Sequence, residues 1–227
     1  MNRLPVITLD GPAGSGKSTT AREVARRLGY RHLDSGALYR ALTFALLSTG
    51  VPEEEWPGLS QRAFDRFNIW LRPTGPRFQV LLADRVLEEE LRTAEVTARI
   101  SPLSALPAVR AWLLEAQRQA GKDGGLVADG RDMGTVVFPD AELKVFLTAN
   151  LEERAFRRFL ERQDHRPSER ELQEEAEKIR ERDERDSGRS VAPLKMAEGA
   201  IEVDTSNLSF EAQVEVIINH VKVLTER

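Results

Sequence analysis

Short apolar runs alternate with longer helical patterns at the beginning of the chain. Residues 6–10 are such a run, which we interpret as a buried strand of a parallel sheet, and residues 31–35 are interpreted as a second strand. After each run, apolar residues recur at helical spacing until a glycine, Gly29 or Gly50. This strand–helix–strand–helix order predicts a mostly parallel sheet with helices on both sides.

The alternation is interrupted after Gly50. Residues 51–60 are rich in Pro and Glu, which is typical of a loop or short helix, and residues 67–73 and 77–84 predict a β-hairpin. We therefore expect residues 51–100 to be an insert with its own small antiparallel sheet. The remaining patterns predict a helix at 103–120, strands at 124–129, 141–149 and 200–205, and helices at 151–163 and 210–224.

Composition limits the classes of protein to consider. The chain has 227 residues, of which 41% are hydrophobic and 31% charged, as in folded globular proteins. The net charge of −4 does not favour general nucleic-acid binding, and the absence of Cys excludes disulfides and thiolate zinc sites. No signal peptide or membrane span is recognisable, so we expect a soluble cytoplasmic protein without nucleic-acid or membrane partners.

The most specific motif lies between the first strand and the first helix. The segment "GPAGSGKS" fits the phosphate-binding pattern G-x-x-x-x-G-K-[ST] in the strand–helix context that this motif requires. Its glycines let backbone N–H groups approach phosphates, and the helix N-terminus favours anions. The predicted ATP-binding residues are Gly11, Pro12, Ala13, Gly14, Ser15, Gly16, Lys17, Ser18 and Thr19.

A carboxylate ends a later apolar strand and predicts a metal site. Asp129 follows "LVA" at the position where related motifs hold Mg²⁺ directly or through water. The hydroxyl of Ser18 is the second expected ligand. The sequence therefore predicts an ATP-binding protein that uses Mg²⁺.

A helix predicted to begin at Ser168 changes character along one face. Glu171, three residues later, completes a capping box with Ser168. The sparse apolar stripe of this helix continues at the same spacing into three charged residues: Arg182, Asp186 and Arg189. Charges on a stripe that faces inward favour a substrate-binding role over a solvated surface.

Further polar residues follow the predicted strands. Ser35 and Arg40 follow the second strand, and Arg131 and Asp132 follow Asp129, at the sheet edge where α/β proteins bind ligands. No N-K-x-D guanine-binding motif occurs, which favours a small kinase over a GTPase switch. The three histidines, His32, His165 and His220, are interpreted as structural residues.

Two alternatives remain open from these residues alone. One is a different P-loop kinase that phosphorylates another nucleotide or a small alcohol, and for an alcohol Asp132 or Asp34 could be the base. The other is a non-enzymatic protein whose arginine-rich helix contacts RNA, which the negative net charge disfavours.

With these motifs considered together, the chain resembles the bacterial cytidylate kinases, within the P-loop nucleoside monophosphate kinases. The resemblance rests on the segments "ITLDGPAGSGKS", "LDSGALYR", "VADGRDMGTVVFPDAELKVFL", "RERDERDSGRSVAPL" and "EVDTSNLS". It implies transfer of a phosphoryl group from ATP to CMP or dCMP, with Mg²⁺, by a protein that we expect to be a monomer.

The resemblance also implies an architecture and residue roles. The fold would be a five-stranded parallel sheet flanked by helices, with a core of residues 1–36, 101–156 and 190–227, a monophosphate-binding region with the insert at 37–100, and a short lid with its following helix at 157–189. Arg154 and Arg158 would contact ATP. CMP would be bound by Ser35, Arg40, Ser101, Arg110, Arg131, Asp132, Arg182, Asp186 and Arg189. The catalytic residues would be Lys17, Arg131, Arg158, Arg182 and Arg189.

Overall fold

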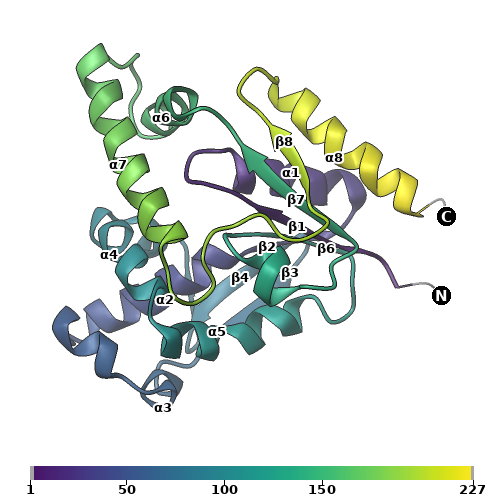
Figure 1. The fold of residues 1–227 in the computed structure, drawn as a ribbon. Helices are drawn as coiled ribbons and strands as arrows, with labels where there is room; N and C mark the ends of the chain where they lie inside the picture. Colours follow the sequence, from purple (N-terminus) through teal and green to yellow (C-terminus); the bar gives the residue numbers. More distant parts are fainter. Residues whose placement is uncertain (1–2, 226–227) are drawn as a thin grey trace.

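Five parallel strands form the centre of the molecule. In the computed structural model, which describes residues 3–225, they are arranged in the order β2-β6-β1-β7-β8 (Figure 1). Their bounds are β1 (Val6–Asp10), β2 (Arg31–Asp34), β6 (Leu126–Asp129), β7 (Leu143–Thr148) and β8 (Ile201–Asp204). Each neighbouring pair is parallel, so the predicted five-stranded parallel sheet is confirmed. The carboxyl ends of β1, β2 and β6 lie at one edge.

Helices cover both faces of this sheet, as the alternating pattern predicts (Figure 1). On one face, apolar residues of β1 and β7 pack with α1 (Lys17–Leu28) and α8 (Phe210–Thr225). On the other face, α2 (Ser35–Ser48) and α5 (Pro107–Ala120) bury their apolar sides. The strands β1 and β6 are buried along their whole length, which explains their mostly apolar sequences.

The insert contains the predicted hairpin, but its sheet is not separate. Strands β3 (Ile69–Thr74) and β4 (Arg77–Leu82) pair antiparallel, and a third strand, β5 (Arg85–Leu87), adds to β4. The hairpin joins the edge strand β2, where the His32 N–H donates to the Pro76 carbonyl at 2.9 Å. The parallel sheet thereby continues into an eight-stranded mixed sheet. Pairing with the hairpin covers an edge that would otherwise leave unpaired backbone groups.

The helix predicted at 103–120 is present, but it begins at Pro107, four residues later than predicted. The structure has α4 (Ala94–Ser104) and then α5, with Leu106 between them in an extended conformation. Leu106 precedes Pro107, and the proline ring disfavours a helical conformation in the residue before it. The expected start of the core at residue 101 therefore lies inside α4. Short helical turns complete this region: η1 (Glu53–Gly58), α3 (Gln61–Asp65) and η2 (Glu89–Arg92).

Helix α7 (Glu169–Ser187) begins after Ser168 as predicted, and the predicted inner stripe lies on its buried side. Both hydrogen bonds of the capping box between Ser168 and Glu171 are present. Ile179 and Asp186 are buried on its inner side, and α7 packs against α6 (Leu151–Leu160). Across residues 3–225, no helix has the length and apolar character needed to span a membrane.

Candidate active site

The glycine-rich loop between β1 and α1 depends on close backbone contacts. Gly11 has φ 148°, and a Cβ there would lie 2.0 Å from the carbonyl oxygen of Leu147. Gly14 has φ 76°, and its Cβ would lie 2.9 Å from the carbonyl oxygen of Arg154. Any larger residue would push the loop away from β7 or α6. Glycines at these two positions therefore let the loop backbone lie directly against β7 and α6.

Lys17 lies within this loop. Its side chain is buried, and Nζ donates to the Pro12 carbonyl at 2.6 Å and to Ser15 Oγ at 3.3 Å. Burial lowers the pKa of Lys17, and the charge of Arg131 lowers it further, although Asp129 opposes both. The ammonium group thus lies beside the loop amides, where a phosphate oxygen would be its natural partner.

Ser18 and Asp129 are brought together at the carboxyl ends of β1 and β6. Ser18 Oγ donates to Asp129 Oδ2 at 2.5 Å, and His32 Nε2 lies 2.7 Å from Oδ1. Burial alone would raise the pKa of Asp129, but the hydrogen bond and charge of His32, with the hydroxyl of Ser18, lower it overall. The carboxylate is therefore ionised at neutral pH.

This pair fits a magnesium site of the kind that shares its ion with a nucleotide. The donors are one carboxylate and one hydroxyl, which are the oxygen ligands that Mg²⁺ prefers. Within residues 3–225, no cluster of three or more His, Cys, Asp or Glu side chains is placed to hold a metal. The remaining ligands would be phosphate oxygens and water, as is usual for Mg²⁺ in phosphoryl-transfer sites.

Around Asp186, three arginines from the predicted set converge. Arg131 Nε donates to its Oδ2 at 2.8 Å, Arg189 donates to Oδ1, and Arg182 Nε lies 4.0 Å from Oδ2. Burial favours protonation of Asp186, but the charges of Arg131 and Arg189 outweigh it and hold its pKa below the ordinary value. One carboxylate thus positions three guanidinium groups.

These arginines belong to a larger concentration of positive charge. Burial lowers the pKa of Arg182 to about 9, and the nearby charges of Arg131, Arg40 and Arg158 contribute in the same direction. Arg182 and Arg131 also act on Lys17 at the loop. Five predicted cations therefore converge on one region, which is favourable only when an anion shares it.

A second group of predicted residues surrounds Asp132. Its Oδ2 forms a buried ion pair with Arg110, whose Nη1 also donates to the Ser104 carbonyl at 2.9 Å. The guanidinium of Arg110 lies 5.5 Å from the centre of the Tyr39 ring. Arg189 links this group to Asp186 because its Nη2 donates to Ser104 Oγ at 2.8 Å as well.

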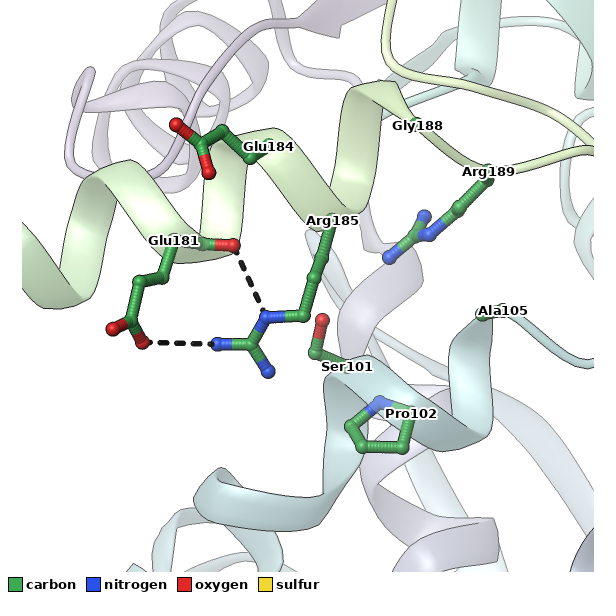
Figure 2. Close-up of a pocket in the computed structure, with 8 residues that line it drawn as sticks. All are labelled: Ser101, Pro102, Ala105, Glu181, Glu184, Arg185, Gly188 and Arg189. Carbon is green, nitrogen blue, oxygen red and sulfur yellow. Dashed lines mark hydrogen bonds and ion pairs between the residues drawn. The ribbon is translucent and has the colours of Figure 1, made fainter.

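An open cavity of about 640 Å³ adjoins this group, between α4 and the end of α7 (Figure 2). Ser101 lies on the α4 side, and the guanidinium of Arg189 points into the space between the two helices. Ser101 Oγ is buried and has no hydrogen-bond partner. The outer rim carries Glu181 and Arg185, which pair with each other.

Arg154 and Arg158, expected to act together on ATP, have different surroundings. Arg154 lies under the loop, where it donates to the Ala13 carbonyl at 3.0 Å and pairs with Asp183. Arg158 pairs with Glu161 and lies near Arg182 and Arg40. Arg154 therefore supports the loop from α6. Arg158 belongs to the positive cluster, which also contains Arg40, Arg131 and Arg182.

Sequence reasoning missed two carboxylates in this region. Asp10 ends β1 directly before the loop, so the signal that identified Asp129, an acidic residue ending a buried strand, was present there too. Asp183 accepts the Ala13 N–H at 2.8 Å and lies four residues after Ile179, within the inner stripe of α7. Both could have been found by the patterns already used.

A phosphate-binding loop, a strand-end carboxylate beside its serine and a convergence of arginines define a P-loop kinase. Comparison with known proteins then identifies the group. Residues 7–223 match the family described as cytidylate kinase, and the chain belongs to that family. It is therefore a phosphotransferase.

Similar proteins cover nearly the whole chain. A cytidylate kinase of Pseudomonas aeruginosa (strain UCBPP-PA14) is 48% identical over 218 residues, which is 96% of this chain and 95% of that protein. A cytidylate kinase of Stutzerimonas stutzeri (strain A1501) is 48% identical over 221 residues, with 96% and 95% covered. A bifunctional pantoate ligase/cytidylate kinase of Synechococcus sp. (strain RCC307) is 44% identical over 96% of this chain but only 43% of its own length.

Proposed function

We propose that this kinase transfers the γ-phosphoryl group of ATP to CMP, and to dCMP, with Mg²⁺ bound at Ser18 and Asp129. The observation that carries this proposal concerns unpartnered polar atoms in the described part of the chain. Ser101 Oγ, Arg182 Nε and Arg189 Nε are buried without a hydrogen-bond partner, and all three belong to the residues expected to bind CMP. Buried polar atoms without partners are costly, so a ligand at this position would satisfy them.

The loop and the positive cluster would hold the two phosphate groups at the reacting ends. The backbone of Gly14 to Ser18 and the ammonium of Lys17 face the ATP phosphates. Arg40, Arg131 and Arg189 bind the phosphate of CMP from the other side. Positioning of this kind removes much of the barrier, because the two reactants no longer have to be oriented during the reaction.

In the reaction, a phosphate oxygen of CMP forms a bond to the γ-phosphorus as the bond to ADP breaks. The leaving electron pair stays on the β-phosphate oxygen of ADP. A phosphate has a second pKa near 6, so the acceptor is ionised at neutral pH and no general base is needed. Negative charge spreads over the transferring group, and Arg131, Arg158 and Arg182 stabilise it. When bound, Mg²⁺ neutralises charge between the β- and γ-phosphates.

Asp132 is the residue that we propose to recognise the cytosine base. A carboxylate accepts well from the N4 amino group of cytosine, whereas uracil presents an acceptor oxygen at the same place. The ion pair with Arg110 holds the Asp132 carboxylate in position for this contact. Ser101 and Arg110 complete the surroundings of the base, and Asp186 faces the ribose.

Steady-state ADP formation with ATP·Mg²⁺ tests this function against CMP, dCMP, UMP, AMP, GMP and dTMP. Turnover is expected on CMP and dCMP, with UMP well behind. In the variant Asp132→Ala, the preference for CMP over UMP should fall by about 100-fold, since a site that hydrogen-bonds its substrate rejects a mismatched analogue. Turnover that is equally fast on several purine nucleotides would refute the assignment.

Two finer expectations belong to the same proposal. The lid would be the segment from Arg157 to Arg170, which connects α6 to α7. The protein would act as a monomer, as the resemblance to the nucleoside monophosphate kinases implies. Sedimentation at micromolar concentration tests the second expectation.

A further inference from the structure

Asp10 is a buried carboxyl group to which the mechanism above gives no role. It ends β1, and its side chain is 3% exposed. Its Oδ1 accepts from the Met133 N–H at 2.9 Å, and its Oδ2 accepts from the Gly134 N–H at 2.7 Å. These two N–H groups open η3 (Met133–Val137), a single π-helical turn. Asp10 therefore ties the beginning of this turn to the central strand.

The turn η3 follows directly after Asp132, the residue proposed to recognise the base. Asp132 is the residue before η3, with φ −142° and ψ 23°, and Arg131 precedes it. The next two amides are held by both oxygens of Asp10, so the backbone leaving Asp132 has little freedom. One carboxylate at the end of β1 thus fixes the direction in which Asp132 points.

The contact leaves no room for adjustment. A Cβ on Gly134 would lie 2.9 Å from Thr8 Oγ1 and 3.4 Å from Asp10 Oδ2. Thr8, Asp10 and Gly134 therefore meet at distances that only glycine allows. The turn thus packs against β1 through the side chains of Thr8 and Asp10.

The carboxyl group is kept in this place at an energetic cost. The pKa of Asp10 is raised to about 6, because burial and the charge of nearby Asp132 together outweigh the two backbone hydrogen bonds and the charge of Lys17, which lower it. A group kept where its ionised form is disfavoured is better explained by function than by stability.

We propose that Asp10 is a positioning residue for base selectivity: its carboxylate holds the turn that directs Asp132 toward the cytosine. This inference rests on the proposed function, because it requires Asp132 to read the base. Asp10 itself touches neither substrate.

The test compares kcat/KM for CMP and UMP in Asp10→Asn, Asp132→Ala and Glu142→Gln. An asparagine keeps the shape but can accept from one amide only, so Asp132 loses its fixed direction. The CMP/UMP preference of Asp10→Asn is expected to fall about tenfold, and KM for CMP to rise, with KM for ATP changed less than about twofold. Glu142 accepts the Val6 N–H at 2.7 Å at the other end of β1, so Glu142→Gln should leave the preference unchanged.

Each outcome separates the inference from the proposed function. If Asp132→Ala reduces the preference and Asp10→Asn lowers both nucleotides equally, the positioning role of Asp10 is wrong and the proposed function stands. If Asp132→Ala leaves the preference unchanged, base reading by Asp132 and the role of Asp10 fail together. Should Asp10→Asn not fold, Gly134→Ala displaces the same turn from the other side, and an unchanged preference there would overturn the inference.

Discussion

The two sides of the active site bind anions by different means. The loop side, Gly11 to Ser18, consists of backbone amides whose approach is set by glycines packed against β7 and α6. The arginine side, Arg131, Arg182, Asp186 and Arg189, consists of long side chains whose positions are set by one buried carboxylate. The residues of the loop side come from one short segment of sequence, whereas the arginine side forms only when α7 packs near the end of β6.

This difference predicts whether a substitution on each side changes the reaction rate or the stability of the fold. Removing a side chain from the arginine side should affect the rate and spare the fold. Adding an atom to the loop side should affect the fold itself. Four experiments test the contrast.

The largest effect is expected for Arg182→Ala, with kcat about 1000-fold lower and a nearly unchanged melting temperature. An arginine on the transferring group contributes roughly 10³–10⁵ in rate, and Arg182 Nε makes no hydrogen bond to the protein and only a contact of 4.0 Å with Asp186. Steady-state kinetics measure the change in kcat, and thermal melting measures the change in melting temperature. Arg180→Ala is the control, since Arg180 is exposed on the same helix and pairs with Glu177. A melting temperature that falls with the rate would contradict the contrast.

Gly11→Ala should show the reverse pattern, a loss of about 3 kcal/mol in the free energy of unfolding. The added Cβ meets the carbonyl oxygen of Leu147, and backbone cannot move aside as a side chain can. Denaturant unfolding measures the loss. Gly50→Ala also forces alanine to a positive φ, 69°, but meets nothing within 4 Å, so it should cost only about 1 kcal/mol. Equal losses would mean that strain in φ, and not the contact, explains both.

The buried carboxyl groups of the two sides should respond to pH with opposite signs. Asp10 has a folded-state pKa of about 6, above its ordinary value, so it is most favourable when protonated. As pH falls from 7 to 4, the wild type should gain stability relative to Asp10→Asn by up to about 3 kcal/mol.

The pKa of Asp186 is lowered instead, so its contribution is complete above the ordinary carboxyl pKa and is lost as pH falls through the folded-state value. The wild type should therefore lose stability relative to Asp186→Asn below about pH 4. Urea unfolding of the three proteins between pH 3 and 7 makes the comparison. Parallel stability curves would show that neither carboxyl group titrates as described.

The smallest effect is expected where the two sides meet. Asp183 accepts the Ala13 N–H and pairs with Arg154. It therefore joins α7 to the loop. Asp183→Asn should raise KM for ATP about tenfold, which corresponds to about 1.4 kcal/mol, with a smaller change in KM for CMP. Glu177→Gln, on the exposed side of α7, is the control. A larger effect on CMP than on ATP would place this contact on the acceptor side.

Several parts of the fold follow from short stretches of sequence. Short strand patterns predicted the five central strands, and the glycines with Lys17 predicted the loop, because each depends on neighbours within about ten residues. Ser168 and Glu171 likewise predicted the start of α7. The helix break before Pro107 was also readable locally, and overlooking it placed the start of that helix four residues too early.

What only the tertiary structure decided is which distant residues meet. The sequence could name Arg131, Asp186 and Arg189 as candidates, but their common carboxylate required β6 and α7 to come together. The contacts of Asp10 with the turn after Asp132 span more than a hundred residues of chain. Local sequence sets backbone conformation, because that depends on adjacent residues. The pairing of buried charges depends on long-range packing, which determines both how far each group is removed from water and which partner it meets.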